Sequence, residues 1–505
     1  MKKTKILAAL LAASLCFPSF ALTGCSQSSG QSSSGSTALS STPTDITYAF
    51  VTFNNVPSDT RPEEKAINAI TEKAINVRVH LKLYSVSNYQ QQMTLQISSG
   101  QQLDLFHSLG DLNQYISKNE VVPLDSLLSE YGKNIKSAVP AEFLKCTSAN
   151  GKLYGIPTYK GVAIAPNFVY RLDILNGIGV SPDSIKSIND LDAVFAKVKA
   201  KYPNMTPIAP CNSGDIGTLD AITDVDSLTD NQFLRTGVLV GDSTKVVNYY
   251  ETSEVKTLLK LAHTWYTKGY IAKDAATATT LAAQAIAAGQ AFSYIGGYAG
   301  KESAAQISAQ TGKKMGMVRI GSPYVATDNV NSITWVIPTT SNHSAAAMKF
   351  LNLTYSNKDV LNTLLYGIEG QDYVKTNSDH IAYPNGKNAQ NVSYTASLSS
   401  GLLGNEFLDY LLEGQSSADL KLMDQENKTA PRSKAFGFTF DSSSVKTQYS
   451  SVNNVLNQYL PGLRCGILDP DTQLAKLNSD LNAAGLNDII KAKQSQLDSW
   501  LKQQK

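Results

Sequence analysis

The sequence is poor in the residues that build metal centres and disulfide frameworks. Its 505 residues include five cysteines and five histidines. In the body of the chain Cys146, Cys211 and Cys465 are widely spaced, with no C-x-x-C, and no two histidines form an H-x-x-x-H pair. Three cysteines cannot all pair, so the sequence argues against a disulfide framework and against a zinc site. We expect neither a metal nor a cofactor.

An excess of charge of one sign is also lacking. Lysine and arginine number 44 against 42 aspartate and glutamate, and charged residues make up 17% of the chain. A nucleic-acid partner requires a basic face, so we expect none. No G-x-S-x-G, H-E-x-x-H, Walker A or G-x-G-x-x-G motif stands out, which disfavours an enzyme. A two-carboxylate hydrolase site stays open, with Glu369 and Asp372 as its nearest candidates, although a polar turn also explains this pair.

Long apolar runs are lacking except at the N-terminus. Three lysines precede an apolar run over residues 6–20, and a small-residue stretch follows. That order is typical of a secretory signal, and the run is shorter than the ~20 residues that span a membrane. The stretch ends in Leu22-Thr23-Gly24-Cys25, which resembles the lipobox of bacterial lipoproteins. The resemblance implies that residues 1–24 are a signal peptide and that Cys25 is lipidated and becomes the mature N-terminus.

The segment after Cys25 is nearly all Ser, Gln, Gly and Thr up to residue 41. Such a composition cannot bury enough apolar surface to fold, so we expect a flexible linker over 25–44. Loss of the three lysines leaves 41 basic against 42 acidic residues. Because more than one lipid chain gives stable anchoring, the sequence predicts a soluble body held at the extracellular face of the cell membrane.

The first part of the body predicts an α/β lobe. Residues 45–51 favour a strand, Asp59 or Thr60 can cap a helix with Pro62 in its first turn, and residues 77–83 alternate as a strand. The pattern repeats with a helix over 89–97, a short strand over 103–106, a polar turn over 107–111 and another helix from 112. Strand, helix and strand in this order predict right-handed, parallel crossovers and an open, doubly wound sheet.

Ligands of such sheets bind beyond the carboxyl ends of the strands. Two loops of this lobe lie there, and we predict that their polar residues contact a ligand: Asn54, Asn55, His107 and Asp111. The alternative for each residue is turn chemistry or helix capping, which Asn, Ser and Asp provide in many loops.

Several motifs then point to a family. The order is Asn150-Gly-Lys-Leu-Tyr-Gly-Ile-Pro-Thr158, then Tyr170-Arg-Leu-Asp-Ile-Leu175, and later Ile333-Thr-Trp-Val-Ile-Pro338. This succession resembles the extracellular solute-binding proteins of bacterial ABC importers, in the family 1 branch that includes maltose-binding protein. Residues 367–373, 435–441 and 484–500 resemble an oligosaccharide-type lipoprotein branch of Gram-positive bacteria.

The resemblance implies a type II, periplasmic-binding-protein-like fold: two doubly wound α/β lobes joined by a hinge. It places lobe 1 over 45–150 and 333–375. Lobe 2 then covers 151–332 and 376–505 and includes a C-terminal helical extension. Tyr298 stands where maltose-binding protein has a tryptophan that stacks on sugar. The alternative for Tyr298 is a packing role at a strand end.

The expected function is therefore the lipid-anchored, substrate-binding component of an ABC importer, which binds its ligand in a cleft between the two lobes and delivers it to the permease. The sequence has 24 tyrosines and many side chains with hydroxyl or amide groups. Such side chains suit a polar, uncharged binding site for a neutral carbohydrate, such as an oligosaccharide. We expect Tyr298, Trp335, Phe436 and Phe438 to contact that ligand. The expected partners are ABC permease subunits, and the protein is expected to be a monomer. The alternatives are an anchored extracellular carbohydrate hydrolase and a ligand-binding partner of a sensor kinase.

Overall fold

The computed structural model describes residues 42–52, 55–211, 214–221, 225–228, 238–240, 243–299, 304–389, 391–396 and 401–504. Cys25 and Asn54 lie outside these residues, as does the side chain of Tyr298. Within this described part, every helix is too short or too polar to cross a membrane.

The first sheet is mixed and has five strands in the order β2-β1-β3-β14-β6. These are β2 (Val77–Ser85), β1 (Thr44–Thr52), β3 (Leu105–His107), β14 (Thr334–Val336) and β6 (Ile156–Pro157). β1 pairs in parallel with β2 and β3, whereas β14 runs antiparallel to β3 and β6. The predicted α/β lobe is confirmed, and it gains one strand each from two later parts of the chain.

The local elements of this lobe follow their sequence signals. In β2 the apolar residues Val77, Val79 and Leu81 are buried, while the polar residues between them are more exposed. Helix α1 (Arg61–Ile75) has Pro62 and two glutamates in its first turn and ends at Asn76, which adopts the left-handed conformation. Helix α2 (Val86–Ser99) connects β2 to β3 and ends at the left-handed Gly100.

The second sheet has four strands in the order β13-β7-β12-β8. They are β13 (Met315–Arg319), β7 (Ala165–Arg171), β12 (Ala291–Tyr298) and β8 (Thr206–Ile208). Helices α8 (Leu191–Lys201) and α9 (Ser253–Thr267) bury Phe195 and Trp265 in its core, with ring centroids 4.9 Å apart in an edge-to-face contact. This sheet and its helices form the second lobe.

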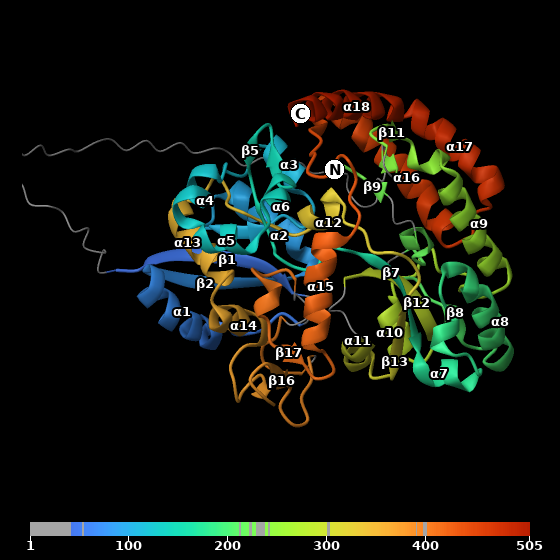
Figure 1. Ribbon diagram of the computed structural model, residues 1–505, viewed down its shortest axis with the longest axis horizontal. Helices are drawn as coiled ribbons and strands as arrows, with labels where there is room; N and C mark the ends of the chain where they lie inside the picture. The colour runs from blue at the N-terminus through green and yellow to red at the C-terminus, as the bar shows by residue number, and fades with distance from the viewer. Residues whose placement is uncertain are drawn as a thin grey trace, which may run out of the picture. The chain divides into compact units, whose positions relative to one another are not determined.

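Three C-terminal helices pack on the second lobe. They are α16 (Lys446–Arg464), α17 (Pro470–Ala483) and α18 (Leu486–Gln503). In Figure 1 α16 and α17 lie beside α9, and α18 packs on α16 and α17. Their core contains Leu456, Leu477 and Leu497 together with Val255 and Leu259 of α9. We call residues 434–504 the C-terminal module.

Described residues between Ile381 and Tyr410 pack in the first lobe, whereas the resemblance placed this stretch in lobe 2. Tyr394, Leu403 and Tyr410 lie in the same hydrophobic core as β1 and β14. The carbonyl of Leu402 accepts a 3.0 Å hydrogen bond from Nε1 of Trp335. The described elements of this stretch are short: β16 (His380–Ala382), the 3-10 helix η6 (Glu406–Leu408) and β17 (Leu411–Leu412), so no helical or strand periodicity indicates where it packs.

Helix α15 (Ser417–Thr429) braces the chain where it leaves the first sheet for β7. The buried Asn427 amide donates to the carbonyl of Lys160 at 2.8 Å and accepts from the amide of Val162 at 2.8 Å. Glu426 forms an ion pair with Arg319 on the second sheet, with N–O distances of 2.7 and 3.2 Å. The connection between the lobes is therefore held by side chains of one helix.

Candidate functional site

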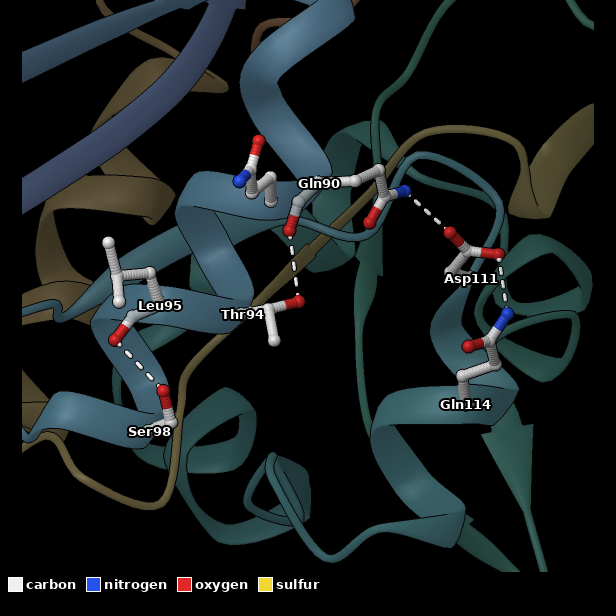
Figure 2. A pocket seen from close by; sticks show the side chains of 7 residues that line it. Gln90, Thr94, Leu95, Ser98, Asp111 and Gln114 are labelled. Atoms are coloured by element: carbon white, nitrogen blue, oxygen red, sulfur yellow. Dashed lines mark hydrogen bonds between the residues drawn. The ribbon is translucent and has the colours of Figure 1, made fainter. Parts of the chain in front are cut away.

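A polar pocket lies at the carboxyl ends of β2 and β3, between α2 and α3 (Leu112–Ser117). Its volume is about 550 Å³, within the ~300–1,000 Å³ range of small-molecule sites. The residues that line it carry amide, hydroxyl, carboxylate and aliphatic groups: Gln90, Gln91, Thr94, Leu95, Ser98, Asp111 and Gln114. Figure 2 shows how α2 and the start of α3 present them. We call this the first pocket.

One face of α2 supplies most of the lining. Gln90, Thr94 and Ser98 recur every four residues, which places them on one side of the helix. Tyr89 and Met93 are fully buried on the other side, so the apolar face of α2 fixes the direction of the polar face. Leu95 is 54% exposed and gives the pocket an apolar patch among the polar groups.

Asp111 is the centre of a hydrogen-bond network. Its carboxylate accepts a 2.5 Å hydrogen bond from Nε2 of Gln90 and a 3.1 Å hydrogen bond from Nε2 of Gln114 (Figure 2). The hydroxyl of Tyr115 donates to Oε1 of Gln90 at 3.2 Å, which fixes the orientation of that amide. The network holds the carboxylate in place before any ligand arrives.

The electrostatics of the first pocket are those of a single carboxylate among neutral groups. Burial raises the pKa of Asp111, and the hydrogen bond from Gln90 and the charge of Lys118 act against that shift. Neither lysine nor arginine is among the lining residues. A carboxylate in such surroundings is a strong acceptor for hydroxyl groups.

The lining chemistry is that of a binding site for hydroxyl groups. Asp111 is the one ionisable side chain among the lining residues, whereas glycoside hydrolysis commonly requires two carboxyl groups. In the described ranges of the chain, His, Cys, Asp and Glu form no group of three that could hold a metal ion. Among the described residues Cys146 and Cys465 are free, buried thiols.

The structure corrects the ligand role predicted for His107. Its side chain is fully buried in β3, where Nε2 accepts a 3.0 Å hydrogen bond from the amide of Val51. The ring stacks on Tyr89 with centroids 4.7 Å apart. Burial lowers the pKa of His107 to about 3, so the imidazole is neutral at physiological pH. His107 is a residue of the protein core.

Two of the aromatic residues proposed as sugar contacts, Trp335 and Phe438, are buried packing residues. Trp335 is fully buried in β14 and stacks on Tyr48 with centroids 4.7 Å apart. Phe438 is 3% exposed and packs against Trp500. Phe436 is half-buried against the core of the first lobe, with the Arg432 guanidinium 5.4 Å from its ring centroid. Both faces of β14 are covered, so its side chains have no path to a ligand.

The remaining predicted residues differ in position. Asp111 lines the first pocket, and Asn55 is exposed beyond the end of β1. The backbone of Tyr298 pairs with Ala165 at the end of β12, and its ligand contact stays a prediction.

Gln90 and Gln114 were not predicted from the sequence as residues of the site. The helical stripe of amides and hydroxyls on α2 could have indicated Gln90, because that stripe leads towards the loop that follows β3.

Comparisons with known proteins agree with this architecture. Residues 65–370, more than half of the chain, match the sequence model of the family described as bacterial extracellular solute-binding protein. Residues 434–502 match a domain of unknown function, DUF3502. A carbohydrate ABC transporter substrate-binding protein of Streptococcus pneumoniae serotype 4 is 25% identical over 453 residues, which are 87% of each chain.

Solved structures of similar fold include two from Streptococcus pneumoniae. The N-glycan transport solute binding protein NgtS in complex with Man5GlcNAc is 25% identical, with a TM-score of 0.74 over 92% of this chain and 99% of that one. The substrate binding protein FusA in complex with kestose is 16% identical, with a TM-score of 0.60 over 91% of this chain and 100% of that one. FusA is similar in fold alone.

Proposed function

We propose a function for this chain that starts from its family: the chain belongs to the bacterial extracellular solute-binding proteins. We propose that it is the lipid-anchored substrate-binding component of an ABC importer for a neutral carbohydrate. Proteins of this family bind a solute without converting it, so the chain is not an enzyme. It acts outside the cytoplasm, as the family does. The carbohydrate ligand, the lipid anchor and the permease are the parts that we propose.

The network around Asp111 is the observation that carries the carbohydrate assignment. A sugar hydroxyl both donates and accepts hydrogen bonds, and the first pocket offers both kinds of partner. The carboxylate of Asp111 accepts, and the amides of Gln91 and Gln114 can donate and accept. The exposed Leu95 can pack on the C–H groups of a pyranose. A charged ligand is disfavoured because the lining supplies no cation and only one anion.

The relatives support the same ligand class. The Streptococcus pneumoniae relative is named for carbohydrate transport, and NgtS was crystallised with Man1GlcNAc and with Man5GlcNAc. We therefore propose that the ligand is an oligosaccharide or a glycan with several sugar units. Asn54 and Asn55 on the first lobe and Tyr298 on the second remain proposed contacts, on opposite walls of a cleft between the lobes. Delivery then requires two permease subunits, with the protein acting as a monomer tethered through Cys25.

A thermal-shift screen of the purified protein tests the proposal. A ligand at ~100 times its dissociation constant stabilises the folded state by ~2.7 kcal/mol, so a matching glycan should raise the melting temperature clearly. The screen should include neutral oligosaccharides, amino acids, peptides and divalent metals. If only compounds other than sugars raise the melting temperature, the carbohydrate assignment is overturned.

A second assay addresses the alternatives. Incubation of each stabilising glycan with the protein, followed by chromatography, should return the glycan intact. Release of shorter sugars would replace the proposal with a hydrolase. Vesicles that contain the cognate permease subunits should import the glycan only when the protein is present, which distinguishes an importer component from a sensor kinase partner.

A further inference from the structure

A second pocket lies on the other side of α3 from Asp111. Its volume is about 230 Å³. The residues that line it come from α3, from the loop after it, from the region of the β4–β5 hairpin and from the C-terminal module: Asn113, Ile116, Ser117, Asn119, Ala149, Asn150, Tyr154, Thr439, Phe440, Asp441 and Ser443. Strands β4 (Ser148–Ala149) and β5 (Lys152–Leu153) form that hairpin.

The two sides of this second pocket belong to different cores. Ile116 and Tyr154 pack against the hydrophobic core of the first lobe, whereas Phe440 is buried in the core that the C-terminal module shares with α9. The sides are joined by a 3.2 Å hydrogen bond from the Asn113 amide to the carbonyl of Phe440. A ligand here would therefore contact both the first lobe and the C-terminal module.

Three polar side chains on the first-lobe side have no protein partner. In the part of the chain that the structure describes, the Tyr154 hydroxyl and the side-chain amides of Asn119 and Asn150 take part in no hydrogen bond, although all three residues line the second pocket. The backbones of Asn119 and Asn150 are fixed in left-handed turns, with φ of 56° and 52°. Asn119 and Asn150 are exposed and Tyr154 is partly exposed, so these groups can exchange water for a ligand without giving up a bond to the protein.

The charge and size of the second pocket define the ligand class. Asp441 is its one charged lining residue, and Oδ1 of that carboxylate already accepts from the amide and hydroxyl of Ser443, at 2.9 and 2.5 Å. An anion finds no cationic partner among the lining residues, and one carboxylate supplies too few ligands for a divalent metal ion. The volume exceeds the ~30 Å³ share of one water molecule many times and is below the ~300–1,000 Å³ of drug-sized sites.

We propose that the second pocket is an accessory saccharide site that takes one neutral pyranose unit. This inference rests on the proposed carbohydrate function. Asn119, Asn150 and Tyr154 bind the sugar hydroxyls, and Ile116 contacts its C–H groups. Because the sugar contacts both the first lobe and the C-terminal module, its binding favours the arrangement in which these two parts face each other.

Calorimetry with glycans of increasing length tests the site. The probes are mono-, di-, tetra- and hexasaccharides of glucose, of mannose and of N-acetylglucosamine, measured against the wild type and three variants. Tyr154→Phe removes the free hydroxyl and keeps the ring. Ser117→Phe fills the pocket. Tyr266→Phe, on α9 and outside both pockets, is the matched control.

For the wild type we expect two sugar sites, or a gain in affinity with glycan length. Tyr154→Phe should weaken the second site or the longer glycans by about 3- to 10-fold, and Ser117→Phe should abolish that contribution. Tyr266→Phe should match the wild type. Hydrogen exchange of residues 439–443 should slow on adding sugar to the wild type and should not change in Ser117→Phe.

The outcomes separate this inference from the proposed function. If the wild type binds glycans and Tyr154→Phe and Ser117→Phe bind every length equally well, the accessory site is overturned and the carbohydrate function stands. If the wild type binds no glycan of any length, the proposed function fails and the accessory site fails with it. Circular dichroism confirms that each variant is folded, and Tyr154→Phe provides the test if Ser117→Phe does not fold.

Discussion

The side chain of Gln90 on α2 donates a 2.5 Å hydrogen bond to the carboxylate of Asp111, the residue that precedes α3. The bond connects the helix after β2 to the loop after β3, so two crossovers of one sheet present a single polar surface. Tyr115 holds the other end of the Gln90 amide. Neither Gln90 nor Asp111 can turn away without breaking a bond, which makes the acceptor rigid.

Replacement of Asp111 should weaken carbohydrate binding. A hydrogen bond to a charged group contributes about 1.5–3 kcal/mol, so Asp111→Asn should reduce affinity by roughly 10- to 150-fold in calorimetry. Asp274→Asn, an exposed carboxylate outside both pockets, is the control. Since burial raises the pKa of Asp111, affinity should start to fall at a higher pH than an ordinary aspartate would give. Unchanged affinity in Asp111→Asn would remove the first pocket from the binding site.

Glu63 should make the stability of the protein depend on pH. Its side chain is buried at the start of α1, Oε2 has no hydrogen-bond partner in the described chain, and burial together with the charge of Asp372 raises its pKa to about 7. Because the pKa is higher in the folded state, the contribution of Glu63 to stability is fully present below about pH 4.5 and is lost as the pH rises towards 7.

Glu63→Gln removes that dependence. The variant should be more stable than the wild type at pH 8, by about 1–3 kcal/mol, and the difference should shrink at pH 5. Chemical unfolding at the two pH values measures it. Glu72→Gln, on the same helix and partly exposed beside Arg78, should not reproduce the gain. If the stability difference between Glu63→Gln and the wild type is the same at pH 5 and pH 8, the raised pKa of Glu63 is contradicted.

The first lobe could be predicted from the sequence because its signals are local. Alternation in β2 and the proline and acidic residues of α1 define elements that need few distant partners. The packing of residues 376–412 could not be predicted, because it depends on contacts such as that between Leu402 and Trp335, which lie far apart in the chain. Periodicity says which face of an element is apolar and not which element covers it.

The candidate site was predictable in part for the same reason. The rule on carboxyl ends of strands selected Asp111, which lines the first pocket. The same rule selected His107, which is the last residue of β3 and is still inside the sheet. A shift of one strand boundary decides whether a side chain lies in the core or in a loop. The prediction that Trp335 contacts a sugar rested on its aromatic side chain alone. A sequence does not distinguish an aromatic residue that is buried in the core from one that stacks on a sugar.

Replacement of the cysteine at the lipobox should release the protein from the membrane. Cys25→Ser keeps the polar linker and removes the thiol that accepts the lipid. We expect the variant either to appear in the medium or to retain residues 1–24, and fractionation followed by mass spectrometry of the N-terminus distinguishes these. Cys146→Ser, a buried thiol, is the control and should remain anchored. A processed Cys25→Ser protein that stays membrane-bound after a salt wash would contradict the lipobox.

Asn427 should be the side chain on which the connection between the lobes depends most. It is 2% exposed, and its amide binds the carbonyl of Lys160 and the backbone amides of Val162 and Ala163. In Asn427→Ala these buried backbone groups lose their partner, and each unsatisfied group costs about 1–3 kcal/mol. We expect a loss of about 2–4 kcal/mol in urea unfolding, together with weaker ligand binding.

Asn427→Asp distinguishes the role of the side-chain oxygen, which accepts hydrogen bonds, from that of the side-chain nitrogen, which donates one. Aspartate keeps an oxygen for the amides of Val162 and Ala163 but cannot donate to Lys160, and its charge is buried. Its stability should therefore fall with rising pH, while that of Asn427→Ala should stay lower than the wild type at every pH. Asn189→Ala, on the second lobe and without such bonds among the described residues, is the matched control. If Asn427→Ala unfolds at the same urea concentration as the wild type, helix α15 does not brace the connection.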